Sequence, residues 1–144
     1  MNRFLGKYSS YLYAILRIVA GLMFAMHGSQ KLFGVPGNTP PMPFASLMGL
    51  AGIIELVGGL MIALGLFTSV AAFIASGLMA FAYFMAHFSA NNPIPNINKG
   101  ELAVVYCFLF LYIAAHGSGI WSIDSMRRAS GYSDGDSSTT NQRR

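Results

Sequence analysis

Four apolar segments, each about 20 residues long, occupy most of the chain: residues 11–29, 46–66, 69–88 and 101–120. A helix needs roughly 20 consecutive apolar residues to cross the hydrocarbon core of a bilayer. Hydrophobic residues make up 54% of the chain and charged residues 10%, whereas about 25% are charged in ordinary soluble domains. The pattern predicts an all-α fold, an integral membrane four-helix bundle whose main surroundings are the lipid bilayer.

The connections between these segments differ in composition. Residues 30–45 are rich in Pro and Gly, and residues 89–100 form a polar loop with two prolines, so neither is expected to be regular helix. The chain after residue 128 is rich in Ser, Asp, Gly and Thr, a composition typical of disorder. We therefore expect one membrane domain at 1–128 and a disordered polar tail at 129–144.

The distribution of Lys and Arg predicts how the bundle is oriented. The cations near the membrane edges are Arg3, Lys7, Arg127 and Arg128 on the side that holds both termini, and Lys31 and Lys99 on the other. Cytoplasmic segments carry the excess of positive residues, so both termini are expected in the cytoplasm. The net charge of +4 then reflects membrane orientation, and no nucleic-acid partner is expected.

Two opposite charges lie inside the first two apolar segments. Arg17 is near the middle of the first and Glu55 near the middle of the second. A charge at the centre of a membrane helix costs roughly 2.5–3.5 kcal/mol on insertion scales, and a bidentate arginine–carboxylate contact is the strongest way to offset it. We expect Glu55 to pair with Arg17, or both to reach one internal polar cavity; the alternative is that Arg17 extends to the cytoplasmic face. Such a pair either fixes helix register or marks a ligand or proton site.

A second polar cluster marks the opposite membrane edge. It contains His27 and Lys31 at the end of the first segment, His87 in the third, and Lys99 and Glu101 at the start of the fourth. Histidine can carry protons or bind metals, but two separated histidines and one glutamate are a weak metal signature, and no metal site is expected. A haem held by two histidines needs both at one depth. His27 and His87 meet that condition, which leaves haem b as the weaker cofactor alternative.

The cysteine count limits the redox chemistry. Cys107 is the one cysteine in the chain, which excludes an internal disulfide and a CxxC motif. Thiol–disulfide chemistry by this chain alone is therefore not expected.

The sequence resembles the DoxX family of small bacterial inner-membrane proteins over residues 11–126. The matching stretches are RIVAGLMFAMHGSQKLFG in the first segment, GIIELVGGLMIALGLFTSVAA across the second and third, NKGELAVVYCFLFLYIAAHG around the fourth, and WSID at 121–124. The resemblance implies a compact four-helix bundle that crosses the bacterial inner membrane several times. The positions that carry the family pattern are Arg17, Gly28, Lys31, Glu55, Glu101, Trp121 and Asp124.

What the resemblance implies for activity is less specific. Family members are described as oxidoreductase-associated, and relatives occur as subunits of a thiosulfate:quinone oxidoreductase. The first hypothesis is a redox-associated subunit that binds a quinone-like lipophilic ligand at Arg17 and Glu55 and exchanges electrons with a partner protein. The second is a non-enzymatic module for membrane assembly, binding or transport of a small solute. Either could form a homodimer, and whether the protein is catalytic stays open. The candidate ligand-binding residues are Arg17, Glu55, His27, Lys31, His87 and Glu101.

Overall fold

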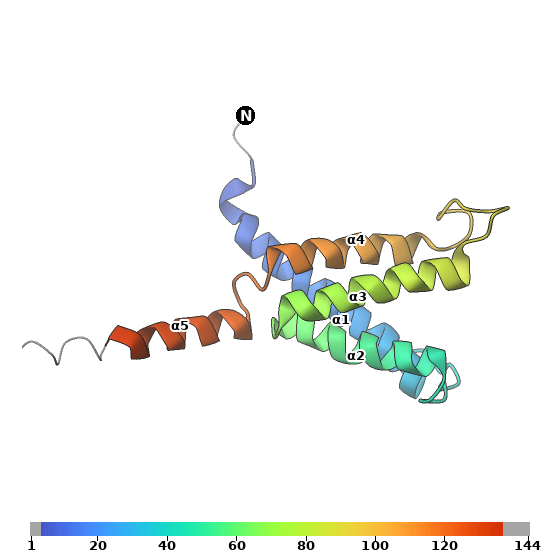
Figure 1. Ribbon diagram of the computed structural model, residues 1–144, viewed down its shortest axis with the longest axis horizontal. Coiled ribbons are helices and arrows are strands. Elements are labelled where there is room, and N and C mark those ends of the chain that lie inside the picture. The colour runs from blue at the N-terminus through green and yellow to red at the C-terminus, as the bar shows by residue number, and fades with distance from the viewer. Residues whose placement is uncertain (1–3, 137–144) are drawn as a thin grey trace, which may run out of the picture.

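The structure, a computed structural model, describes the backbone of residues 4–136 and the side chains of residues 4–130. The elements are a 3₁₀ turn η1 (Gly6–Tyr8), α1 (Ser9–Phe33), α2 (Leu47–Leu64), α3 (Thr68–Ala82), a π-helix η2 (Tyr83–His87), α4 (Glu101–His116) and α5 (Ile123–Asp136). No strand is present among these described residues. The predicted all-α bundle is confirmed (Figure 1).

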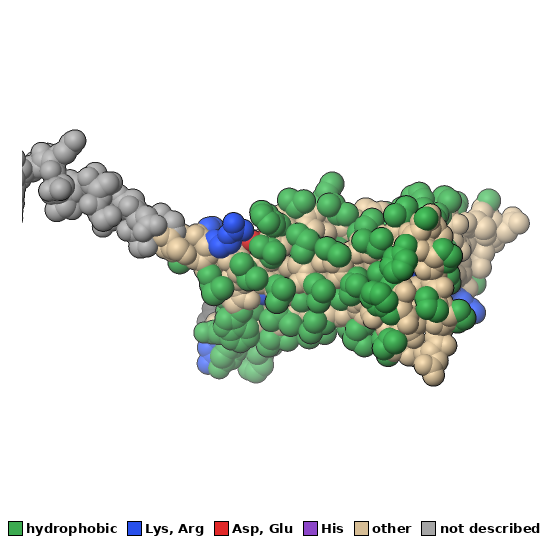
Figure 2. Space-filling view, turned by 90° about the horizontal axis from the view of Figure 1, so that it is seen from below, with side chains coloured by type: hydrophobic (Ala, Val, Ile, Leu, Met, Phe, Trp, Pro, Cys, Tyr) green, Lys and Arg blue, Asp and Glu red, His purple; other side chains and the backbone are tan. Residues whose placement is uncertain are grey.

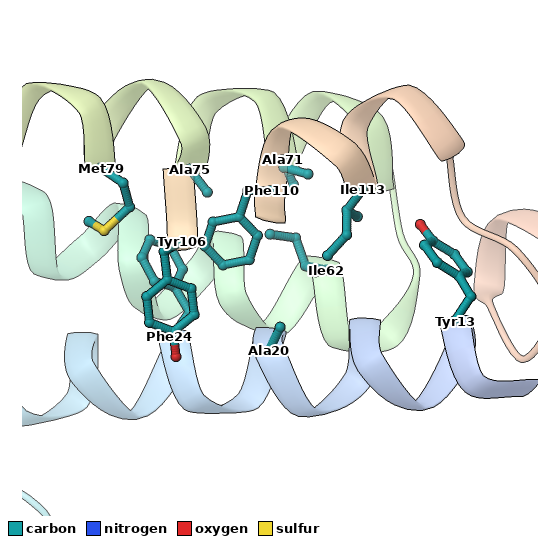
Figure 3. Close-up of a cluster of buried hydrophobic side chains, with 11 residues drawn as sticks. Tyr13, Ala20, Phe24, Ile62, Ala71, Ala75, Met79, Tyr106, Phe110 and Ile113 are labelled. Atoms are coloured by element: carbon teal, nitrogen blue, oxygen red, sulfur yellow. The ribbon is translucent and has the colours of Figure 1, made fainter. Parts of the chain in front are cut away.

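The bundle consists of two helical hairpins. Helix α1 packs against α2, α3 packs against α4, and α2 and α3 join the two pairs (Figure 1). Between the pairs lies an apolar core in which Phe24 of α1 meets the rings of Tyr106 and Phe110 of α4. Ala75 and Met79 of α3 line the same layer (Figure 3). Small side chains on α3 therefore leave room for the aromatic rings of α4.

Three of the four predicted membrane segments are long and apolar enough to cross a bilayer. They lie in Gly6–Phe33, Leu47–Leu64 and Thr68–His87. The fourth, Glu101–His116, is a shorter apolar helix. It ends before the predicted residue 120 because Gly117 adopts a left-handed φ of 87°, a conformation that stops a helix.

The outer surface of the bundle is apolar. Hydrophobic side chains cover its flank, and cationic side chains lie toward its two ends (Figure 2). Among the most exposed are the rings of Phe73, Phe84 and Phe108, at 65%, 64% and 66% of their full area. Water-soluble monomers rarely expose contiguous apolar patches of this kind. The surface is therefore suited to contact with lipid chains.

Glycines bring α1 and α2 into backbone contact. Gly21 faces Gly59, and Gly28 faces Gly52. A Cβ atom on Gly59 would lie 2.5 Å from the amide nitrogen of Ala25, and one on Gly21 would lie 2.7 Å from the carbonyl oxygen of Gly59. Small residues at membrane-helix interfaces permit this close approach, so these glycines set the spacing and register of the first hairpin.

Helix α5 leads away from the bundle at the end that holds the N-terminal region (Figure 1). The Ser122 hydroxyl accepts a hydrogen bond from the Ser125 amide (3.1 Å), which is the arrangement of a helix N-cap. We expected disorder from residue 129, whereas the helix continues to Asp136; the cap accounts for the start of this polar helix at Ile123. The rest of the expected disordered tail, residues 137–144, lies outside the described residues.

Asp124 joins α5 to the start of α3. Its carboxylate accepts hydrogen bonds from the amides of Phe67 (3.0 Å) and Thr68 (3.1 Å) and from the Thr68 hydroxyl (3.1 Å). Burial alone would raise the pKa of Asp124, but these hydrogen bonds and the nearby Arg128 lower the pKa below its ordinary value. Asp124 thus caps α3 from another part of the chain.

The glycine contact predicts that neighbouring glycines respond differently to the same substitution. Gly59→Ala should lower the stability of the detergent-solubilised protein by about 1–3 kcal/mol, as overpacking does, because its Cβ would collide with the backbone of α1. Gly58→Ala is the matched control. Apart from the chain neighbours and the nearby backbone of α2, no atom would lie within 4 Å of the added Cβ. Thermal unfolding measures both; equal effects would show that α1 and α2 do not pack through this face.

The Asp124 cap predicts a pH-dependent loss of stability. A lowered carboxyl pKa in the folded protein stabilises it fully above the unfolded value of about 3.9. This contribution is lost as the pH falls through the lowered pKa. Asp124→Asn should therefore be less stable than the wild type at neutral pH, and the difference should shrink below about pH 4. Thermal unfolding between pH 3 and 7 checks this; a difference that is independent of pH would contradict the cap.

Candidate functional site

Arg17 is fully buried and bonded to backbone carbonyls. Its Nη1 donates to the carbonyl oxygen of Ser118, and its Nη2 donates to that of Trp121 at 2.7 Å. Weaker contacts of 3.5 Å reach the carbonyls of Ile120 and Ala63. These groups lie in the last turn of α2 and just beyond α4, where the partial charge of a helix end is negative. The guanidinium is solvated by the protein and does not reach the surface, since its exposure is 0%.

The predicted Arg17–Glu55 pair is therefore wrong. The facing glycines place Glu55 level with Ala25, about 12 Å along α1 from Arg17 at 1.5 Å per residue. Side chains also lean toward the N-terminus of their own helix. Because α1 and α2 are antiparallel, Arg17 extends toward one end of the bundle and Glu55 toward the other.

Lys31 is the partner of Glu55. Its Nζ lies 2.5 Å from Oε1 of the carboxylate. Lys31 and Glu55 each lean toward the N-terminus of their own helix. Because α1 and α2 are antiparallel, the two side chains lean toward each other and meet although they start at different depths. Glu55 is 2% exposed and its Oε2 is buried without a hydrogen-bond partner among the described residues. One carboxylate oxygen thus accepts no hydrogen bond from the described residues.

This ion pair lies at the wall of a cavity of about 300 Å³ between the two hairpins. Three further ionisable side chains line the cavity: His27 from α1, His87 from η2 and Lys99 from the loop before α4. Phe24 and Tyr106 supply aromatic walls. The cavity therefore combines apolar surface with several polar groups, which is the usual composition of a small-molecule site.

Two departures from regular backbone bring residues to this cavity. The π-helix η2 places His87 at its last position, and π-turns within helices are frequent at functional sites. Lys99 has a left-handed φ of 63°, a conformation that non-glycine residues adopt at a cost of roughly 1–3 kcal/mol. Both side chains line the cavity, so the local strain coincides with the polar site.

The structure separates the predicted site residues into two groups. His27, Lys31, Glu55 and His87 line the cavity, whereas Arg17 and the exposed Glu101 do not. The second form of the prediction, in which Arg17 and Glu55 both reach one internal polar cavity, is therefore also wrong.

Three residues of the family pattern make contacts that hold the fold together: Gly28, Trp121 and Asp124. Gly28 lies against the backbone of α2. Trp121 offers its carbonyl to Arg17 and packs its ring edge-on against Tyr11, with centroids 5.5 Å apart. Asp124 caps α3.

Sequence reasoning missed Tyr106 as a cavity residue. Its ring lies 6.3 Å from that of His27 and stacks on Phe110 at 5.3 Å. The spacing of Tyr106, Phe110 and Ile113 along α4 follows one helix face, and all three are buried. That periodicity could have identified the inward face, but not the cavity at its end.

The described residues contain no group of three or more His, Cys, Asp or Glu side chains arranged to hold a metal ion. The cavity instead offers acid–base and hydrogen-bonding groups: two lysines, two histidines and one carboxylate. These groups can bind and orient a ligand that carries carbonyl or hydroxyl oxygens.

Comparison with known proteins places the chain in a family. The model of the DoxX family matches residues 12–88, more than half of the chain. A Haemophilus influenzae protein, described as an uncharacterized protein, is 42% identical over 127 residues, which cover 84% of this chain and 94% of the relative. No solved structure matches significantly. The chain belongs to the DoxX family of membrane proteins.

Proposed function

We propose that the protein binds the head group of a quinone-like lipophilic ligand in the Lys31–Glu55 cavity and serves as a redox-associated membrane subunit. The observation that carries the proposal is the buried Oε2 of Glu55, which has no hydrogen-bond partner among the described residues. A buried polar atom without a hydrogen bond costs about 1–3 kcal/mol. A ligand hydroxyl would satisfy this oxygen.

The cavity chemistry suits a quinone head group in either redox form. Quinone carbonyls accept hydrogen bonds, which Lys99 or Lys31 can donate. Hydroquinone hydroxyls donate hydrogen bonds, which Glu55 can accept. Phe24 and Tyr106 provide apolar and aromatic contact. At about 300 Å³, the cavity is at the small end of ligand sites and suits one substituted ring, with the lipophilic tail left in the membrane.

This proposal moves the site away from Arg17. The guanidinium is bonded to the carbonyls of Ser118 and Trp121 and lies at the other end of α1 from Lys31. We propose that Arg17 holds the segment after α4 against the bundle, while Lys31 and Glu55 serve the ligand.

We further propose a multi-pass protein of the bacterial inner membrane with both termini in the cytoplasm. The excess of cationic residues at the end of the bundle that holds the termini supports this orientation, and the cavity would then lie in the outer half of the membrane. Electrons would pass between the bound quinone and a partner protein. The cavity side chains would supply acid–base groups and aromatic contacts.

Native mass spectrometry of the gently extracted protein tests the proposal. A quinone-mass ligand in about one copy per chain is expected in the wild type, because the free carboxylate oxygen binds it. Glu55→Gln should reduce its occupancy at least about 10-fold, since loss of a hydrogen bond to a charged group costs roughly 1.5–3 kcal/mol.

Glu101→Gln is the matched control, since Glu101 is exposed and does not line the cavity; it should retain the ligand. Ordinary phospholipid alone in all three proteins would contradict the proposal and favour the non-enzymatic assembly or transport module. A haem mass would contradict it as well and would direct attention to His27 and His87.

A further inference from the structure

We propose that His87 selects the redox form of the ligand by its own protonation: neutral His87 binds the hydroxyl form and protonated His87 binds the carbonyl form. The inference rests on the proposed function of the cavity and adds the residue that discriminates between the two forms. It concerns binding and proton position alone, so no electron transfer by this chain is required.

The first support is the hydrogen bond that one ring nitrogen of His87 makes. Nδ1 lies 3.2 Å from the carbonyl oxygen of Asn98. A carbonyl oxygen only accepts hydrogen bonds, so Nδ1 carries the hydrogen. In the neutral ring, Nε2 then holds the lone pair and is an acceptor. This hydrogen bond therefore leaves Nε2 as the ring nitrogen that can bind a ligand.

The second support is that Asn98 is itself held in place. Its Nδ2 donates to the carbonyl of Asn92 at 3.2 Å, and its Oδ1 accepts from the amide of Gly100 at 2.9 Å. Tyr83, at the start of η2, donates its hydroxyl to the carbonyl of Pro93 at 2.6 Å. The loop 89–100 is thus bound to the π-helix, and the histidine ring is fixed between the loop and the cavity.

The third support is the position of the ring relative to the π-helix. The Phe88 amide donates to the carbonyl of Tyr83 at 2.9 Å, which closes the wide turn that ends at His87. Since Nδ1 is directed at the loop, Nε2 lies on another edge of the ring, and His87 lines the cavity. We infer that this edge faces the ligand.

The other ionisable groups at the cavity are less suited than His87 to discriminate between the two ligand forms. Lys31 is engaged with Glu55, and the ammonium group of a lysine such as Lys99 donates hydrogen bonds but accepts none. Glu55 offers an acceptor oxygen, but a carboxylate cannot donate to a carbonyl unless it is protonated. His27 contacts the ring of Tyr106 edge-on, and no described residue hydrogen bonds its ring nitrogens, so its tautomer is not fixed.

Protonation changes what His87 offers. In the imidazolium form both ring nitrogens donate, so Nε2–H can bind a quinone carbonyl oxygen. In the neutral form Nε2 accepts the hydrogen bond of a hydroquinone hydroxyl. The proton gained or lost by His87 comes from or returns to water. The cavity should accordingly prefer the oxidised form at low pH and the reduced form at higher pH.

Equilibrium titration with a short, tail-less benzoquinone and with its hydroquinone, without oxygen, tests this inference. The detergent-solubilised protein is titrated between pH 5 and 8, the range in which histidine changes charge. For the wild type, the ratio of the two dissociation constants should change about 10-fold or more across this range, as expected for one hydrogen bond to a charged group.

Variants identify the titrating group. His87→Asn keeps an amide nitrogen for the Asn98 carbonyl but lacks Nε2, so it should fold and bind both forms with a ratio independent of pH. His116→Gln is the control, because His116 stacks on Tyr13 at 3.7 Å and does not line the cavity; it should behave as the wild type.

Three outcomes would overturn the inference. A wild-type ratio independent of pH, with both forms bound, would refute the role of His87 and leave the quinone site intact. A pH dependence that persists in His87→Asn and disappears in His27→Asn would assign the role to His27. Absence of binding by either form to any variant would overturn the proposed function together with the inference.

Discussion

A charge buried in a membrane protein must be solvated by the protein itself, and this constraint organises both ends of the bundle. Arg17 finds backbone carbonyls beyond α4, and Glu55 finds Lys31. Water is not available in the hydrocarbon region to replace these partners. The direction in which each side chain leaves its helix decides which partner it can reach, so the antiparallel arrangement of α1 and α2 separates the two charges.

This separation gives the two ends different roles. At the end that holds α5, Arg17 and Asp124 bind backbone groups of other elements and hold the chain together. At the opposite end, Glu55 lines a cavity, and one of its oxygens has no hydrogen-bond partner in the described part of the chain. The structural use of Arg17 therefore leaves Glu55 to pair with Lys31.

The helices were largely predictable because their signals are local. Runs of apolar residues identified all four membrane segments. The predicted end of α4 was too late: the segment was extended to Ile120, whereas Gly117 has a positive φ of 87° and ends the helix at His116. Helix α5 was missed because its polar composition hides the capping contact of Ser122.

The site was less predictable because it depends on register. Matching the centres of two segments placed Arg17 and Glu55 near one depth, whereas the glycine contacts shift them apart along the helix axis. The second predicted cluster comprised His27, Lys31, His87, Lys99 and Glu101, and the structure places all of these except Glu101 at one cavity. Its link to Glu55 could not be seen without knowing which way each side chain leans.

The central claim is that Glu55 is coupled to Lys31 and independent of Arg17, and two double-mutant cycles on unfolding free energy test it directly. The cycles combine Glu55→Gln with Lys31→Met and with Arg17→Gln. We predict a coupling of at least about 1 kcal/mol for Lys31, and additivity within about 0.5 kcal/mol for Arg17. Strong coupling of Glu55 to Arg17, with additivity for Lys31, would contradict the account.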